Sequence, residues 1–138
     1  MNEAYLRLAR HHSLPDESRT AFLAAASKTM RRVLVDYARA RQRHKRGGNP
    51  ERVPLEDAEP LLTQEESIEI LALEEALERL AVAQPRAALV VEHRFYSGLT
   101  LEEIAGLLGV SEKTIQRDWL AARAWLRKEV SRSLELPE

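Results

Sequence analysis

The chain has 138 residues, of which 44% are hydrophobic and 31% charged, a length that suffices for one domain or two small ones. It has no cysteine, no signal-peptide pattern and no run of about 18 apolar residues, which excludes disulfides, cysteine-ligated zinc and a membrane span and favours a cytoplasmic protein. Residues 1–48 carry 11 Lys and Arg against 4 Asp and Glu, residues 49–84 carry 2 against 10, and residues 85–138 carry 8 against 8. The net charge of −1 therefore hides a basic block at residues 1–48, and it does not exclude a nucleic-acid partner for that block.

The N-terminal third predicts two helices. Residues 2–11 predict the end of one helix, and Pro15 interrupts it. A second helix is predicted from about 19 to 46, where Gly47 and Gly48 end it. Its expected apolar face consists of Phe22, Ala25, Ala26, Met30, Val33, Leu34 and Tyr37.

Residues 47–66 are rich in proline, glycine and acidic side chains and predict a linker. From Ser67 onward the pattern predicts four helices that end at about residue 134. Pro85 is expected at the first turn of the second of these helices, a position that tolerates proline. We expect that second helix to bury Val91 and Phe95. The expected fold is therefore all-α, with a segment 1–46, a linker 47–66 and a helical domain 67–134.

Residues 99–120 predict a helix-turn-helix. Thr100 and Ser111 are suitable N-caps for its two helices, and Glu103 completes a capping box with Thr100. Ala105 is small where the two helices must approach closely, and Gly109 can take the positive φ that the turn requires. The alternative is an ordinary helical hairpin with a glycine turn.

The inner and outer faces of this motif differ in chemistry. Its inner faces are expected to contain Ile104, Leu107, Leu108, Ile115, Trp119 and Ala122. Its outer face carries polar and cationic side chains that can reach phosphates and base edges, namely Lys113, Thr114, Gln116 and Arg117. A surface of this kind favours docking in a DNA groove.

The predicted helix 19–46 ends in a second candidate site. Its cations are Arg31, Arg32, Arg39, Arg41, Arg43, Lys45 and Arg46. Arg32, Arg39 and Arg43 lie on one side of a helix and can follow a phosphate backbone, although cations at a helix end can also simply complement its dipole. Asp36 is expected to pair with Arg32 or Arg39.

No catalytic or metal-binding pattern accompanies these two sites. The sequence has no glycine-rich phosphate loop and no nucleophile–base arrangement. His11 and His12 have no third ligand at a useful spacing. We therefore expect a protein that is not an enzyme and that binds no metal and no cofactor.

The chain resembles bacterial sigma factors of the extracytoplasmic-function (ECF) group, in the sigma-70 family. The likeness is carried by Glu3–Leu8, Met30–Gly48, Val53–Leu55, Glu75–Leu80, Phe95–Gly98, the helix-turn-helix, Asp118-Trp119 and Ala124–Leu126. The resemblance implies a sigma-2-like segment over 1–46 and a four-helix sigma-4-like domain over 67–134. It also implies a transcription initiation factor that directs core RNA polymerase to double-stranded promoter DNA, with an anti-sigma factor as a further partner that it allows.

Site residues follow from the resemblance by position. Arg31, Arg32, Asp36, Arg39 and Arg43 would lie in the helix that faces the −10 element. The surface facing the −35 element would contain Ser111, Lys113, Thr114, Gln116 and Arg117. Residues 11–18 would correspond to the loop near which the DNA strands open.

The chain departs from the family at its start, because family members have further helices before the EAYLRL motif. We therefore expect the apolar face of 22–37 to lack most of its packing partners and residues 1–46 to be less stable than 67–134. Two alternative functions stay open on this ground. One is a stand-alone helix-turn-helix regulator, and the other is a protein-interaction module that binds polymerase or an inhibitor protein through its helices.

Overall fold

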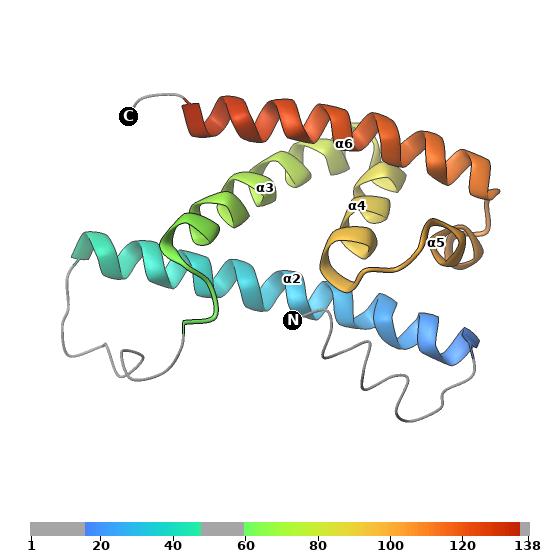
Figure 1. Cartoon of the computed structure of the whole chain (residues 1–138), viewed down its shortest axis with the longest axis horizontal. Coiled ribbons are helices and arrows are strands. Elements are labelled where there is room, and N and C mark those ends of the chain that lie inside the picture. The colour runs from blue at the N-terminus through green and yellow to red at the C-terminus, as the bar shows by residue number, and fades with distance from the viewer. Residues whose placement is uncertain (1–15, 48–59, 136–138) are drawn as a thin grey trace.

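A computed structural model describes residues 16–47 and 60–135 (Figure 1). The predicted helix at 2–11, residues 11–15 of the predicted loop and most of the linker lie outside the described residues. The described part contains no strand and five helices: α2 (Asp16–Gly47), α3 (Gln64–Ala83), α4 (Pro85–Ser97), α5 (Leu101–Leu108) and α6 (Glu112–Glu135). The predicted all-α class is confirmed, and so are the four helices expected in the C-terminal half.

Local sequence explains where α3 and α4 begin and end. The Oγ1 atom of Thr63 accepts a hydrogen bond from the backbone N of Glu66 (3.0 Å), and the Glu66 carboxylate accepts one from the backbone N of Thr63 (2.9 Å). This capping box starts α3 three residues before the predicted Ser67 and shortens the linker. Pro85 occupies the first turn of α4, as predicted, and Gly98 ends that helix with a φ of 71°.

Helices α3 and α4 lie between the two long helices α2 and α6 (Figure 1). A continuous core joins them, in which Met30 and Leu34 of α2 cluster with Leu77 of α3, Val91 of α4 and Leu126 of α6. A fully buried leucine such as Leu77 contributes about 1.5–3 kcal/mol through burial. Helix α2 is therefore held by the same core as α3, α4 and α6.

The predicted apolar face of α2 is wrong in its register. The buried hydrophobic side chains of α2 are Leu23, Ala26, Met30, Leu34, Val35 and Ala38. Ala25 and Val33, which were expected on this face, are exposed, and Phe22 and Tyr37 are half-buried. The buried face differs from the predicted one because α3 and α4 cover α2 on the side where Met30, Leu34 and Ala38 lie.

The expectation that this face lacks packing partners is also wrong, because α3 and α4 cover it. The reason for expecting residues 1–46 to be the less stable part is thereby removed. The motive for a protein-interaction module, an uncovered apolar face on α2, disappears as well. The division into 1–46, 47–66 and 67–134 stays a prediction about sequence units.

Helix α4 buries more of its surface than one stripe. It contacts α2, α3, α5 and α6, so Val90, Val91 and Tyr96 are all buried. Phe95, predicted to be buried, is 47% exposed, whereas its neighbour Tyr96 is 1% exposed. Ile68 of α3 is likewise exposed, at 39%.

Candidate nucleic-acid interface

Helices α5 and α6 form the predicted helix-turn-helix with the predicted caps. Thr100 and Glu103 make both hydrogen bonds of a capping box, at 3.0 and 2.9 Å. Gly109 ends α5 with a φ of 72°, and its backbone N donates to the Ala105 carbonyl at 2.9 Å. The Ser111 hydroxyl accepts a hydrogen bond from the backbone N of Thr114 at 3.1 Å and so caps α6.

A small apolar cluster fixes the angle between the two helices. Ile104 of α5 and Ile115 of α6 are fully buried against each other's helix, together with Leu23 of α2. Leu107, predicted for the inner face, is 39% exposed and does not belong to this cluster. Trp119 is half-buried, and the Arg94 guanidinium carbon lies 5.7 Å from the centre of its ring.

The outer face of α6 presents the polar side chains that the sequence predicted. Lys113, Gln116 and Arg117 are exposed, and within the described residues none of them makes an ion pair or a side-chain hydrogen bond. Thr114 is half-buried, and its hydroxyl accepts a hydrogen bond from Ser111 at 2.9 Å. Lys113, Gln116 and Arg117 are therefore free to contact a ligand, whereas Thr114 already has a local partner.

An ion pair beside this face was missed by the sequence analysis. Arg86 of α4 makes two hydrogen bonds to the Asp118 carboxylate of α6, at 2.6 and 3.3 Å, and they raise the pKa of Arg86. The pairing offsets a negative charge next to Arg117, which would otherwise repel phosphates. These two residues lie 32 positions apart, so no local pattern could have indicated the pair.

Helix α2 carries the second candidate surface. Arg32, Arg39 and Arg43 are exposed, as predicted. Asp36 is exposed too, but in the described part of the chain it pairs with neither Arg32 nor Arg39, so the predicted local ion pair is wrong. Lys28 was missed by the sequence analysis and lines a shallow hollow of about 190 Å³ together with Arg32 and Arg39. The side chains of Lys45 and Arg46 lie outside the described residues.

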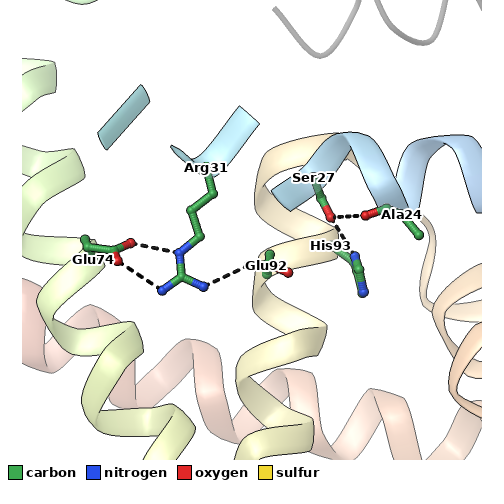
Figure 2. A network of polar contacts seen from close by, with 6 residues as sticks. All are labelled: Ala24, Ser27, Arg31, Glu74, Glu92 and His93. Atoms are coloured by element: carbon green, nitrogen blue, oxygen red, sulfur yellow. Dashed lines mark hydrogen bonds and ion pairs between the residues drawn. The ribbon is translucent and has the colours of Figure 1, made fainter. Parts of the chain in front are cut away.

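Arg31 lies apart from these exposed cations. Figure 2 shows its side chain reaching between Glu74 of α3 and Glu92 of α4. Its Nε and Nη2 atoms are 2.8 and 3.3 Å from the Glu74 carboxylate, and its Nη1 atom is 2.8 Å from Glu92. Burial lowers the pKa of Arg31, but the bonds to both carboxylates outweigh that effect and raise it. In this arrangement Arg31 is committed to internal ion pairs and is not available to a phosphate.

A buried polar contact lies one turn away on α2 (Figure 2). The Ser27 hydroxyl donates a hydrogen bond to the Ala24 carbonyl at 2.7 Å, and it lies 2.8 Å from the His93 Nδ1 atom of α4. Because the hydroxyl proton is used by Ala24, Nδ1 carries a proton and donates to Ser27. Burial lowers the pKa of His93, with a smaller opposing contribution from Glu92. The imidazole is therefore neutral at pH 7.

No group of three or more His, Asp or Glu side chains is placed to hold a metal ion in residues 16–47 and 60–135. In the same residues, no helix has the length and apolar character needed to cross a membrane.

A family model described as ECF sigma factor matches residues 1–132, nearly the whole length. No curated protein and no solved structure matches the chain. ECF sigma factors are non-enzymatic factors that work with core RNA polymerase in transcription initiation. Both candidate surfaces lie inside the matched region, and the chain belongs to the ECF sigma factor family.

Proposed function

We propose that this chain selects promoters for RNA polymerase by placing the N-terminal turns of α6 in the major groove of the −35 element. The observation that carries the proposal is the exposed set Lys113, Gln116 and Arg117 on the capped second helix of a helix-turn-helix; none of the three makes an ion pair with another described residue. Helices in such motifs read base edges with their N-terminal residues. One apolar cluster, which contains Ile104 and Ile115, packs α6 against α5.

The side chains differ in what they can recognise. Arg117 matches the two acceptors of guanine, and Gln116 matches the donor and acceptor of adenine. Lys113 and the Ser111 hydroxyl suit phosphate oxygens, as do the free backbone N–H groups at the start of α6. Thr114 contributes to the cap of α6, and we assign it a supporting contact at the same surface.

Helix α2 supplies the second contact in this proposal. Arg32, Arg39 and Arg43 follow the phosphates at the upstream edge of the −10 element, and Asp36 lies among them at the same surface. Arg31 joins this set only when its ion pairs with the two glutamates are broken. Core RNA polymerase is the obligatory partner, and an anti-sigma factor is a further partner of the same helices.

Base reading by Arg117 can be tested once duplexes have been selected from a random library by the purified chain. Arg117→Ala should weaken binding to the selected duplex by about 1–3 kcal/mol, and it should leave binding to a scrambled duplex nearly unchanged. Arg127→Ala is the matched control, because Arg127 is an exposed, unpaired arginine further along α6 within the described chain. Equal losses for both variants on both duplexes would show that Arg117 contacts phosphate only and would remove the reading role.

A further inference from the structure

Asp118 is an acidic residue on the helix that the proposed function places in a DNA groove. It directly follows Arg117, and consecutive residues of an α-helix lie about 100° apart around its axis. Asp118 is therefore on the flank of α6, beside the reading face rather than on it. A bare carboxylate at this position would repel the phosphates of any duplex that Arg117 touches.

Arg86 pairs with Asp118 through one edge of its guanidinium group. The Nε atom donates to one carboxylate oxygen at 2.6 Å, and the Nη2 atom donates to the other at 3.3 Å. A guanidinium carries five N–H donors in a planar, fixed arrangement, so the donors on Nη1 and the second one on Nη2 stay unused by Asp118. Within the described residues they have no other partner, and they form a second edge suited to two oxygens of one phosphate.

The surroundings of Arg86 restrict where this second edge can lie. Pro85, at the first turn of α4, has a fixed φ, and Ala87 and Ala88 are buried in the core. The backbone of Arg86 is therefore held in place, while its side chain is 49% exposed. The hydrogen bonds to Asp118 then fix the far end of the side chain. An arginine held at both ends loses little conformational entropy when it binds a ligand.

The dimensions of a DNA groove bring this arginine close to a phosphate strand. A helix with its side chains is about 10–12 Å across, and the major groove is about 12 Å wide. A helix that fills the groove has its flanks along the two sugar–phosphate strands. Arg86 extends from the flank of α6 on which Asp118 lies, so the outermost charge on that flank is positive.

We propose that Arg86 of α4 binds a backbone phosphate of the DNA and that Asp118 is the positioning residue that aims it. This inference rests on the proposed function, because it requires α6 to enter a groove. The contact carries no sequence information itself, but it fixes how α6 is placed along the duplex and hence which base edges Arg117 meets. A single exposed ion pair thereby connects α4 to the accuracy of reading by α6.

A second ion pair of the chain provides a matched comparison. Arg79 of α3 pairs with Glu129 of α6 at 3.1 Å, so it also joins α6 to an earlier helix. Its arginine and acid are 52% and 18% exposed, against 49% and 16% for Arg86 and Asp118. Glu129 lies eleven residues further along α6, about 16 Å from Asp118. Loss of the Arg79 pair should therefore not affect a contact made at the N-terminal turns of α6.

A charge-neutral double variant separates a phosphate contact from simple charge cancellation. Arg86→Gln with Asp118→Asn removes one positive and one negative charge, and Arg79→Gln with Glu129→Gln does the same at the control pair. Loss of one phosphate contact should lower the steepness of log affinity against log salt concentration by about 0.9. In 0.1 M salt this corresponds to about an eightfold loss of affinity for the duplex selected by the natural chain. The control variant should show neither change, and circular dichroism checks that both variants are folded.

Neutral phosphates identify the contact directly. Each phosphate of the selected duplex is replaced, one at a time, by an uncharged methylphosphonate. Neutralising the phosphate that Arg86 binds should weaken binding of the natural chain about eightfold and leave binding of the Arg86→Gln, Asp118→Asn variant nearly unchanged. Arg86→Lys, which keeps the charge but has no second edge, should lose most of this coupling. Equal effects of every replacement on the natural chain and on both variants would overturn the contact.

Asp118→Asn alone tests the positioning role. This variant keeps Arg86 and makes the flank of α6 more positive, so charge alone predicts tighter binding to every duplex. Positioning by Asp118 predicts instead that neutralising the phosphate bound by Arg86 weakens this variant less than the natural chain, because the guanidinium is no longer held in one orientation. Undiminished coupling to that phosphate would overturn the role of Asp118.

The outcomes separate this proposal from the proposed function. If the purified chain selects no duplex, the proposed function fails and the phosphate contact of Arg86 fails with it. If the chain selects a duplex that Arg117→Ala weakens, while the Arg86→Gln, Asp118→Asn variant keeps the salt dependence of the natural chain, only this inference is overturned. The Arg86 pair would then be a structural tether, as the Arg79 pair is.

Discussion

Gly106 and Gly109 lie three residues apart and place opposite demands on the backbone. Gly106 is an interior residue of α5, whereas Gly109 has a φ of 72° and ends that helix. A Cβ atom added at either position would meet no atom within 4 Å. Replacement by alanine therefore changes backbone energetics alone at both positions, with no steric clash and no lost packing.

The two substitutions should have effects of opposite sign. Alanine in the left-handed region costs about 1–2 kcal/mol, and the reduced entropy of the unfolded chain offsets part of this cost. Gly109→Ala should therefore lower the free energy of unfolding by about 1 kcal/mol. Gly106→Ala should raise it by about 0.8–1 kcal/mol, which is the difference in helix propensity. At roughly 4 °C per kcal/mol for a chain of this size, the two melting temperatures should differ by about 8 °C.

Urea unfolding followed by circular dichroism at 222 nm measures both changes. Gly109→Asn serves as a third variant and should recover part of the loss, because asparagine tolerates the left-handed conformation. A Gly109→Ala protein as stable as Gly106→Ala would show that the turn is not left-handed. The helix-turn-helix geometry argued from this turn would then be refuted.

Two further predictions concern the core and the buried histidine. Ile115→Ala should lower the free energy of unfolding by about 2–5 kcal/mol in the same urea assay, because Ile115 is fully buried. The control Leu120→Ala, at a position that is 62% exposed, should change the free energy of unfolding by less than about 0.5 kcal/mol. Similar losses for the two variants would contradict the described packing. Burial lowers the pKa of His93 below its ordinary value of 6.5. As the pH falls, His93 is therefore protonated in the unfolded state before it is protonated in the folded state. Stability should be constant above pH 6.5 and fall below it by up to about 1.4 kcal/mol per pH unit, and His93→Gln should remove this slope between pH 5.5 and 6.5.

Features set by residues close in sequence could be predicted. The caps at Thr100 and Ser111 and the turn at Gly109 depend on hydrogen bonds and dihedral angles within four residues. The same reasoning could have found the start of α3, since Thr63 and Glu66 have the same spacing as Thr100 and Glu103. That signal was present in the sequence and was overlooked.

Features set by distant residues could not be predicted. In the sequence, Arg31 cannot be distinguished from the other cations of a basic helix. Its partners Glu74 and Glu92 lie 43 and 61 positions away, so no local pattern indicates the ion pairs. The register of the buried face of α2 likewise depends on which helices cover it. Phe95 and Tyr96 are neighbours of similar hydropathy, so the sequence does not indicate which of the two is buried. Tertiary packing decides it, and Tyr96 is the buried one.

The most direct test of the central claim is transcription by core RNA polymerase on fragmented genomic DNA, with and without the chain, with all transcript starts mapped. The account predicts new discrete starts that share a sequence element about 35 base pairs upstream. It also predicts that Arg117→Ala removes or redistributes these starts, while Arg127→Ala leaves them in place. A pattern of starts identical to that of core polymerase alone would contradict the assignment of promoter selection to this chain.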